Sequence, residues 1–183
     1  TQLTDTQLAA WESGPGDEMQ ISQKQFVDQS LQDEVNLSAK LTAGKEGASR
    51  ITKPSEKTFV LPLETQFPLA QQKQLLKSAT EKKQRHVSLL YDGSDAEKVF
   101  QVVSLIGEAK LGRVAGTPAA NVAEMKNMPS WSVSAGYYEV PDTKADIPNY
   151  QTSFVVFENG VTSEVAFDYG TYVLRGKLTK LDM

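Results

Sequence analysis

The chain has 183 residues, of which 23% are charged and 39% hydrophobic, and its net charge is −4. These values are typical of a globular domain with a sizeable core, and the acidic balance argues against nucleic acid as a main partner, because phosphate binding needs clustered lysine and arginine. The absence of cysteine excludes thiol catalysis, zinc–thiolate sites and iron–sulfur clusters, and no apolar run is long enough to cross a bilayer.

The first third of the chain has the period-two alternation of half-buried strands. The clearest case is residues 34–42, where one face carries only apolar side chains: Val35, Leu37, Ala39 and Leu41. Residues 18–27 are predicted to pair with this strand through a polar turn at 28–33. Two shorter strands are expected at 48–52 and 58–61.

One amphipathic helix is predicted to interrupt the strands, over residues 68–85. Its apolar stripe consists of Leu69, Leu76 and Ala79, with Leu75 beside them. Proline at position 68 suits the first turn, and the last turn is expected to hold the basic residues Lys82, Lys83 and Arg85. A lone helix in a β protein must bury its stripe on a sheet, so we expect a lid or plug packed on or in the sheet.

Strands are predicted to resume at 86–91 and 98–106. A long loop is expected over 107–129, with one short helix near 121–126. The last third is predicted to form strands at 130–140 and 150–158, separated by a polar loop, and a three-strand antiparallel meander that begins with 150–158. The first two strands of the meander are separated by the Asn159-Gly160 pair, which favours a primed hairpin turn, and its last strand carries Tyr172, Leu174 and Leu178 on one face.

The sequence offers no pattern typical of catalysis. Its single histidine, His86, has no Gly-x-Ser-x-Gly serine to activate, and Arg113-Val114 stand where a phosphate-binding loop needs lysine and then serine or threonine. The Asp92-Gly93-Ser94-Asp95 segment is interpreted as a turn, because the glutamate that closes a calcium loop is absent. We therefore predict no catalytic residue, no metal site and no cofactor. A hydrolase that uses two carboxylates stays open as a less favoured alternative.

Several short motifs recur in an order and spacing that resemble the EipB-like family, cell-envelope integrity proteins of alphaproteobacteria. They are Phe67-Pro68, Tyr91-Asp92-Gly93-Ser94-Asp95, Lys98-Val99-Phe100, Val103 and Ile106-Gly107, followed by Phe157-Glu158-Asn159-Gly160-Val161, Asp168-Tyr169-Gly170 and Leu174-Arg175-Gly176-Lys177-Leu178. The resemblance covers nearly the whole chain. It implies a periplasmic protein without enzyme activity, whose curved antiparallel β-sheet spirals into an incomplete barrel similar to that of the LolA-like lipoprotein carriers.

The sequence departs from the family pattern at two points. Leu69 and Gln71 stand where the resemblance leads us to expect threonine and histidine after Phe-Pro, and the family's pair of cysteines is absent. The chain therefore resembles a divergent or truncated member, a single domain over residues 1–183 that lacks the opening strands of the family domain. Such a chain would expose a sheet edge, so we expect its first strand to pair with a neighbouring chain or to be covered by a loop.

Three functions are considered, in order of preference. The first is a scaffold that supports the envelope by binding another periplasmic or envelope protein, and the second is a carrier that holds a lipid or lipidated peptide in the concave face of the sheet. The third is the carboxylate hydrolase. For a carrier, the candidate groove or plug residues are Leu76, Trp131, Tyr137, Phe154 and Phe157, and core packing is the alternative role for each. An enclosed apolar groove would favour the carrier, and a concave face filled by its own side chains would favour the scaffold.

Overall fold

A computed structural model describes residues 4–111, 127–140 and 147–177. The chain divides into two compact units. The N-terminal unit comprises residues 1–71 and 88–100, and the C-terminal unit comprises residues 72–87 and 101–183. The described part contains no helix with the length and apolar character needed to span a bilayer.

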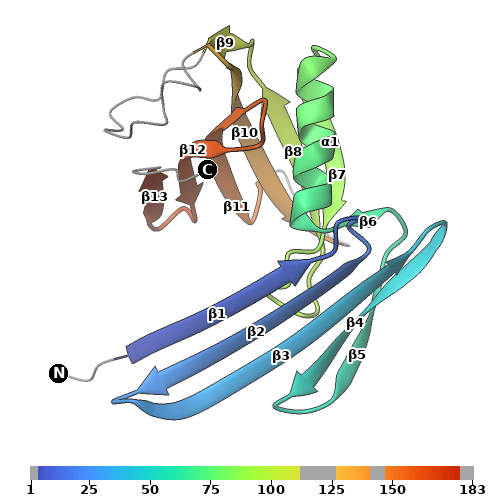
Figure 1. The fold of residues 1–183 in the computed structure, drawn as a ribbon, viewed down its shortest axis with the longest axis vertical. Coiled ribbons are helices and arrows are strands. Elements are labelled where there is room, and N and C mark those ends of the chain that lie inside the picture. The colour runs from blue at the N-terminus through green and yellow to red at the C-terminus, as the bar shows by residue number, and fades with distance from the viewer. Residues whose placement is uncertain (1–3, 112–126, 141–146, 178–183) are drawn as a thin grey trace. The chain divides into compact units, whose positions relative to one another are not determined.

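Five strands form the sheet of the N-terminal unit, in the order in which they occur along the chain (Figure 1). They are β1 (Thr4–Glu12), β2 (Glu18–Val27), β3 (Ser30–Thr42), β4 (Lys45–Lys53) and β5 (Lys57–Leu61). Each strand pairs antiparallel with the next. The predicted strands in this third of the chain are therefore confirmed.

The turn between β2 and β3 is shorter than the sequence analysis predicted. Only Asp28 and Gln29 lie between the strands, and both have positive φ angles, 49° and 68°. Two consecutive residues of this kind make a type I′ turn, whose twist matches that of the flanking strands. The predicted polar turn over 28–33 is wrong in length, because β3 begins at Ser30 and absorbs the irregular spacing as a bulge next to Phe26.

The core of the N-terminal unit is closed by the segment that follows strand β7 (Arg85–Leu90). Tyr91 is completely buried, and its hydroxyl donates a hydrogen bond to the carbonyl of Ala96 at 3.3 Å, as does the hydroxyl of Ser49 at 3.1 Å. Gly93 has a φ of +72°, and a Cβ at this position would lie 2.4 Å from Cδ1 of Ile21. The left-handed backbone favours glycine here, and a larger residue would also require the Ile21 side chain to shift, which explains physically why the Tyr-Asp-Gly motif stands at this turn.

Helix α1 spans Pro68–Thr80 and ends earlier than predicted. Lys82 has a φ of +59°, the amide of Lys82 donates to the carbonyl of Ala79, and the amide of Lys83 donates to that of Ser78. This is a Schellman ending with a left-handed residue after the helix. Consequently Lys82 and Lys83 lie beyond the last turn, which contains Lys77 instead, and Arg85 is the first residue of β7.

The second sheet contains eight strands, six of which continue in the order β13-β12-β11-β10-β8-β7, with β6 next to β7 and β9 next to β10. The bounds are β6 (Thr65–Gln66), β7 (Arg85–Leu90), β8 (Phe100–Ile106), β9 (Lys110–Leu111), β10 (Pro129–Glu139), β11 (Tyr150–Phe157), β12 (Thr162–Asp168) and β13 (Val173–Lys177). The predicted antiparallel meander at the end of the chain is confirmed. The predicted short helix near 121–126 lies outside the described residues.

The hairpin between β11 and β12 differs from the predicted primed turn. Gly160 has a φ of +86°, but Asn159 is not among the residues with positive φ. The amide of Gly160 donates to the carbonyl of Phe157, and the amide of Phe157 donates to that of Val161. These bonds define a three-residue loop in which glycine alone takes the left-handed position.

The predicted fold class is confirmed. The chain is mainly β, its long strands pair antiparallel, and one amphipathic helix is present in the described residues. Neither sheet closes on itself in the part of the chain that the structure describes.

Candidate functional site

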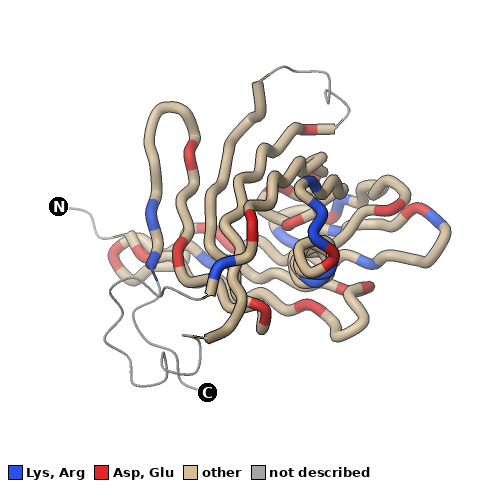
Figure 2. The backbone as a smooth tube through the Cα atoms, turned by 90° about the horizontal axis from the view of Figure 1, so that it is seen from above, with Lys and Arg blue, Asp and Glu red and all other residues tan. Residues whose placement is uncertain are grey.

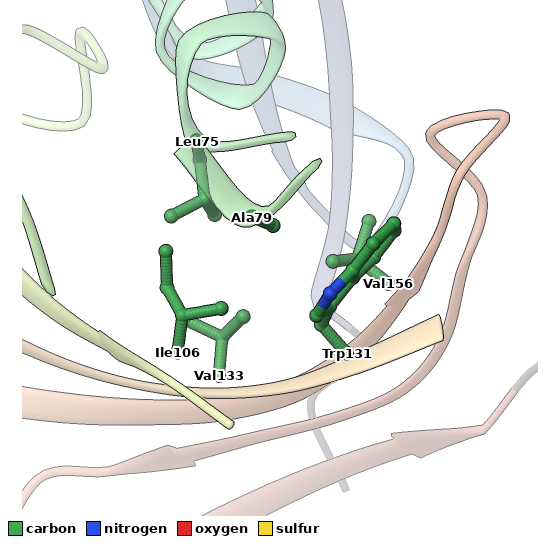
Figure 3. Close-up of a cluster of buried hydrophobic side chains, with 6 residues drawn as sticks. All are labelled: Leu75, Ala79, Ile106, Trp131, Val133 and Val156. Atoms are coloured by element: carbon green, nitrogen blue, oxygen red, sulfur yellow. The ribbon is translucent and has the colours of Figure 1, made fainter. Parts of the chain in front are cut away.

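Protein side chains pack between helix α1 and the C-terminal sheet (Figure 3), and a hollow of about 380 Å³ remains beside Ala79, Ile106 and Trp131. Six buried residues form one cluster, and they are Leu75 and Ala79 of the helix, Ile106 of β8, Trp131 and Val133 of β10, and Val156 of β11. Trp131 is only 5% exposed, and Leu76 and Phe154 pack against the cluster while remaining partly buried. The helix therefore covers the sheet as an integral part of the core.

The five candidate residues of the carrier hypothesis do not gather in one groove. Leu76, Trp131 and Phe154 come together at the cluster. Phe157 is completely buried at the end of β11, where its register partner is Ser130. Tyr137 lies six residues farther along β10 than Trp131, in a separate group of aromatic side chains. A ligand-binding role for these residues stays a prediction.

Four tyrosine rings stack across the end of the C-terminal sheet. The ring centroids of Tyr137 and Tyr150 are 4.2 Å apart, those of Tyr150 and Tyr169 are 5.6 Å apart, and those of Tyr169 and Tyr172 are 4.9 Å apart. Cross-strand aromatic pairs of this kind stabilise a sheet. The stack consequently joins β10 and β11 to the connection before β13, and it gives Tyr137 a structural role.

The opposite side of the C-terminal sheet carries an open groove of about 750 Å³, which we call the β8–β13 groove. Its side chains alternate along each strand with those of the helix-facing side, so they point away from the helix. They are Leu105 on β8, Ser132 and Ser134 on β10, Ser153 and Val155 on β11, Glu164 and Ala166 on β12, and Arg175 and Lys177 on β13.

Hydroxyl and cationic groups dominate the polar part of this groove. Glu164 is the only carboxylate among its lining residues, whereas Arg175 and Lys177 supply two positive charges. A pair of facing carboxylates, which glycoside hydrolysis would need, is therefore absent from this lining. An open groove with three charged side chains also differs from the enclosed apolar cavity that an acyl chain would occupy.

A smaller hollow of about 500 Å³ lies on the N-terminal sheet. The side chains of Trp11, Gln20 and Ser38 share one face of this sheet, because these residues are register partners on β1, β2 and β3. None of these three side chains is ionisable. This hollow offers apolar and amide surface without a charged group.

The ionisable groups with shifted pKa values have structural partners. His86 Nδ1 lies 3.0 Å from the hydroxyl of Ser78, and burial lowers the pKa of His86, with a smaller contribution from the positive charge of Lys83. Burial raises the pKa of the Tyr91 hydroxyl to about 12. No group of three or more potential ligands that could hold a metal ion occurs among the described residues.

The groove was not predicted from the sequence, although part of its pattern was present there. The meander prediction placed Tyr172 and Leu174 on one face of the last strand, which implies that Arg175 and Lys177 share the other face. Their alignment with serines on β10 and β11 could not be predicted, because it depends on the register of four strands.

Comparison with known proteins gives consistent results. The EipB-like family model matches residues 1–183. The cell envelope integrity protein EipB of Brucella abortus (strain 2308) is 30% identical over 182 residues, which cover 99% of this chain and 64% of that protein. The chain thus spans slightly less than two thirds of the length of this relative. A crystal structure of a beta-barrel-like protein of a domain of unknown function from Brucella abortus superposes with a TM-score of 0.82 at 29% identity, covering 100% of this chain and 74% of the other.

Proposed function

Because the chain belongs to the EipB-like family, we propose that it is a non-enzymatic periplasmic protein that supports cell-envelope integrity by binding another envelope protein. The relative from Brucella abortus is named for envelope integrity, which supports this general role. Binding of an envelope protein and location in the periplasm are the further steps of the proposal.

The observation that carries the proposal is the packing of the helix-facing side of the C-terminal sheet. The buried cluster around Trp131, Leu75 and Val156 fills much of this side, and the hollow of about 380 Å³ that remains beside Trp131 has charged residues in its lining. The groove on the opposite side is open, and its charged and hydroxyl side chains suit contact with another polar chain. These features favour a scaffold over a carrier.

The proposal can be tested in the source organism with the gene deleted and the full natural protein restored. A photo-crosslinking amino acid at Ser134, in the groove, and a second at exposed Gln20, on the N-terminal sheet, would report proteins bound to either surface. We expect the restored strain to survive detergent stress and at least one surface to crosslink to an envelope protein.

Native mass spectrometry of the protein purified from the envelope fraction separates the remaining alternatives. If a phospholipid copurifies in stoichiometric amount and no protein crosslinks, the result favours a lipid carrier over a scaffold. If neither a lipid copurifies nor a protein crosslinks, and the deletion strain survives fully, the envelope function itself is contradicted.

A further inference from the structure

The β8–β13 groove has two rows of side chains that run across four strands in register. One row consists of Ser134, Ser153, Ala166 and Arg175. The other row consists of Ser132, Val155, Glu164 and Lys177. Each row therefore ends in a cation on β13, the last strand of the sheet order.

The polar groups of this groove are mostly donors without partners. The side chains of Ser132, Ser134 and Ser153 make no hydrogen bond in the described part of the chain, and those of Arg175 and Lys177 make neither a hydrogen bond nor an ion pair there. With Glu164 as the one carboxylate of the lining, the groove carries a net charge of about +1 on a chain whose net charge is −4. A matching ligand must supply acceptors and negative charge.

The charges in the rest of the described chain are of mixed sign. Figure 2 shows acidic and basic positions interspersed along the chain, without a long run of one sign. Some exposed lysines lie beside carboxylates, as with Lys40 and Glu18 at 2.7 Å and Lys53 and Glu34 at 2.7 Å. Arg175 and Lys177 have no described carboxylate within 4.0 Å, as is also true of Lys45 and Lys57 of the N-terminal sheet, but Arg175 and Lys177 lie two positions apart on one strand of the groove.

The strand that carries these cations also has a free edge. β13 pairs with β12 on one side and has no strand partner on the other among the described residues. Its Val173 and Leu174 side chains are 46% and 55% exposed. Free backbone amides and carbonyls at a sheet edge favour an extended peptide over a small anion, because main-chain pairing adds to the side-chain contacts.

From these observations we infer that β13 and the β8–β13 groove bind an extended acidic segment of a partner protein, which adds to the sheet as a strand. This inference rests on the proposed function and specifies the chemistry of the partner. On the groove side, acidic residues of the segment lie opposite Arg175 and Lys177, two positions apart.

The helix-facing side of the added strand has room for a larger residue. Gly176 lies between the two cations and has no side chain, and its register partner on β12 is Val165. A residue opposite Gly176 can therefore cover Val165 with an apolar side chain. The preferred segment alternates acidic, apolar and acidic residues.

A defined probe for this site is the peptide acetyl-Thr-Glu-Val-Glu-Val-Glu-Thr-amide, with a comparison peptide in which lysine replaces each glutamate. Titration of the isotope-labelled chain, followed by amide chemical shifts, should show binding of the glutamate peptide at concentrations below about 1 mM. The shifts should centre on β13 and β12, and the β13 amides should become protected from hydrogen exchange. The lysine peptide should not bind.

Charge variants make the test specific. Arg175→Glu combined with Lys177→Glu should weaken binding of the glutamate peptide at least about tenfold. The milder pair Arg175→Gln and Lys177→Gln should weaken it less, and it serves as the readout if the reversal disturbs the sheet. The matched control is Lys45→Glu with Lys57→Glu, the same charge change at exposed lysines of the N-terminal sheet, and it should leave binding unchanged.

Several results would overturn the inference. Absence of peptide binding, an equal effect of the control pair, or binding without protection of the β13 amides would each do so. Equal competition by inorganic phosphate or by phosphatidylglycerol vesicles would show that the groove recognises charge alone.

The inference and the proposed function can fail separately. If an envelope protein crosslinks only from the N-terminal sheet while the peptide does not bind, the inference fails and the proposed function stands. If the peptide binds but no envelope protein crosslinks in cells, the proposed function fails.

Discussion

The two sheets of this protein are built from similar antiparallel meanders, yet they bury their side chains very differently. On β10 of the C-terminal sheet, Trp131 and Val133 are buried beneath helix α1. On β1 of the N-terminal sheet, the eight residues from Thr4 to Trp11 are all exposed, including Leu8 at 67%. The difference shows that an apolar residue on a strand becomes core only where another element covers it.

The tryptophans give the sharpest test of this comparison. Trp131→Ala removes the largest side chain of the buried cluster and should lower the free energy of unfolding by about 3–5 kcal/mol, because the helix and sheet cannot fully close the cavity. Trp11→Ala is the matched control, since this ring is half exposed, and it should cost about 1 kcal/mol or less. Urea unfolding followed by far-ultraviolet circular dichroism measures both. Similar losses for the two variants would contradict the assignment of the core.

The same comparison separates what the sequence could predict from what it could not. Alternation on β3 and the helix start at Pro68 were predictable, because each depends on neighbouring residues alone. β1 was missed because its apolar residues Leu8, Ala9, Ala10 and Trp11 are consecutive, and the alternation of a half-buried strand is absent.

The helix end and the groove were missed for other reasons. The helix ends because Lys82 takes a left-handed conformation. This position after a helix is usually occupied by glycine or asparagine, so lysine gave no sign of it in the sequence. The buried cluster was half predicted, since Leu76, Trp131 and Phe154 do meet there. The groove depends on which residues of distant strands are register partners, and local patterns do not contain that information.

A second test concerns the contact that β1 makes with residues 69 and 70, which belong to the same unit. The carboxylate of Glu12 accepts hydrogen bonds from the amides of Leu69 and Ala70, at 2.8 and 3.0 Å, in the first turn of α1. It acts as a cap supplied from a distant strand and satisfies two amides that have no partner within the helix.

Glu12→Ala should therefore lower the free energy of unfolding by about 1 kcal/mol. Hydrogen exchange at Leu69 and Ala70 should accelerate in this variant. Glu46→Ala is a suitable control because this glutamate is exposed and does not cap helix α1, so the amides of Leu69 and Ala70 should exchange at their usual rate in this variant. Unchanged exchange at the two helix amides in Glu12→Ala would show that β1 is held by other contacts.

The smallest expected effect on the free energy of unfolding concerns a polar contact of helix α1 in the C-terminal unit. There, His86 of β7 contacts the hydroxyl of Ser78. Burial lowers the pKa of His86, so the folded state favours the neutral ring. The contribution of the neutral ring to the free energy of unfolding is fully present above the ordinary histidine pKa of about 6.5. This contribution is lost as the pH falls from there through the folded-state pKa, because the unfolded chain takes up the proton first.

Unfolding in urea between about pH 7 and pH 5 should consequently show declining stability in the natural chain. The decline should be shallower in His86→Gln, which cannot titrate there, and the effect should be smaller than that of Glu12→Ala because the ring is only partly buried. The carboxylates with lowered pKa values, Glu34 and Glu81, respond at lower pH and leave this window to His86, the single histidine of the chain. Equal slopes in the two proteins would mean that the contact with Ser78 does not depend on a neutral ring.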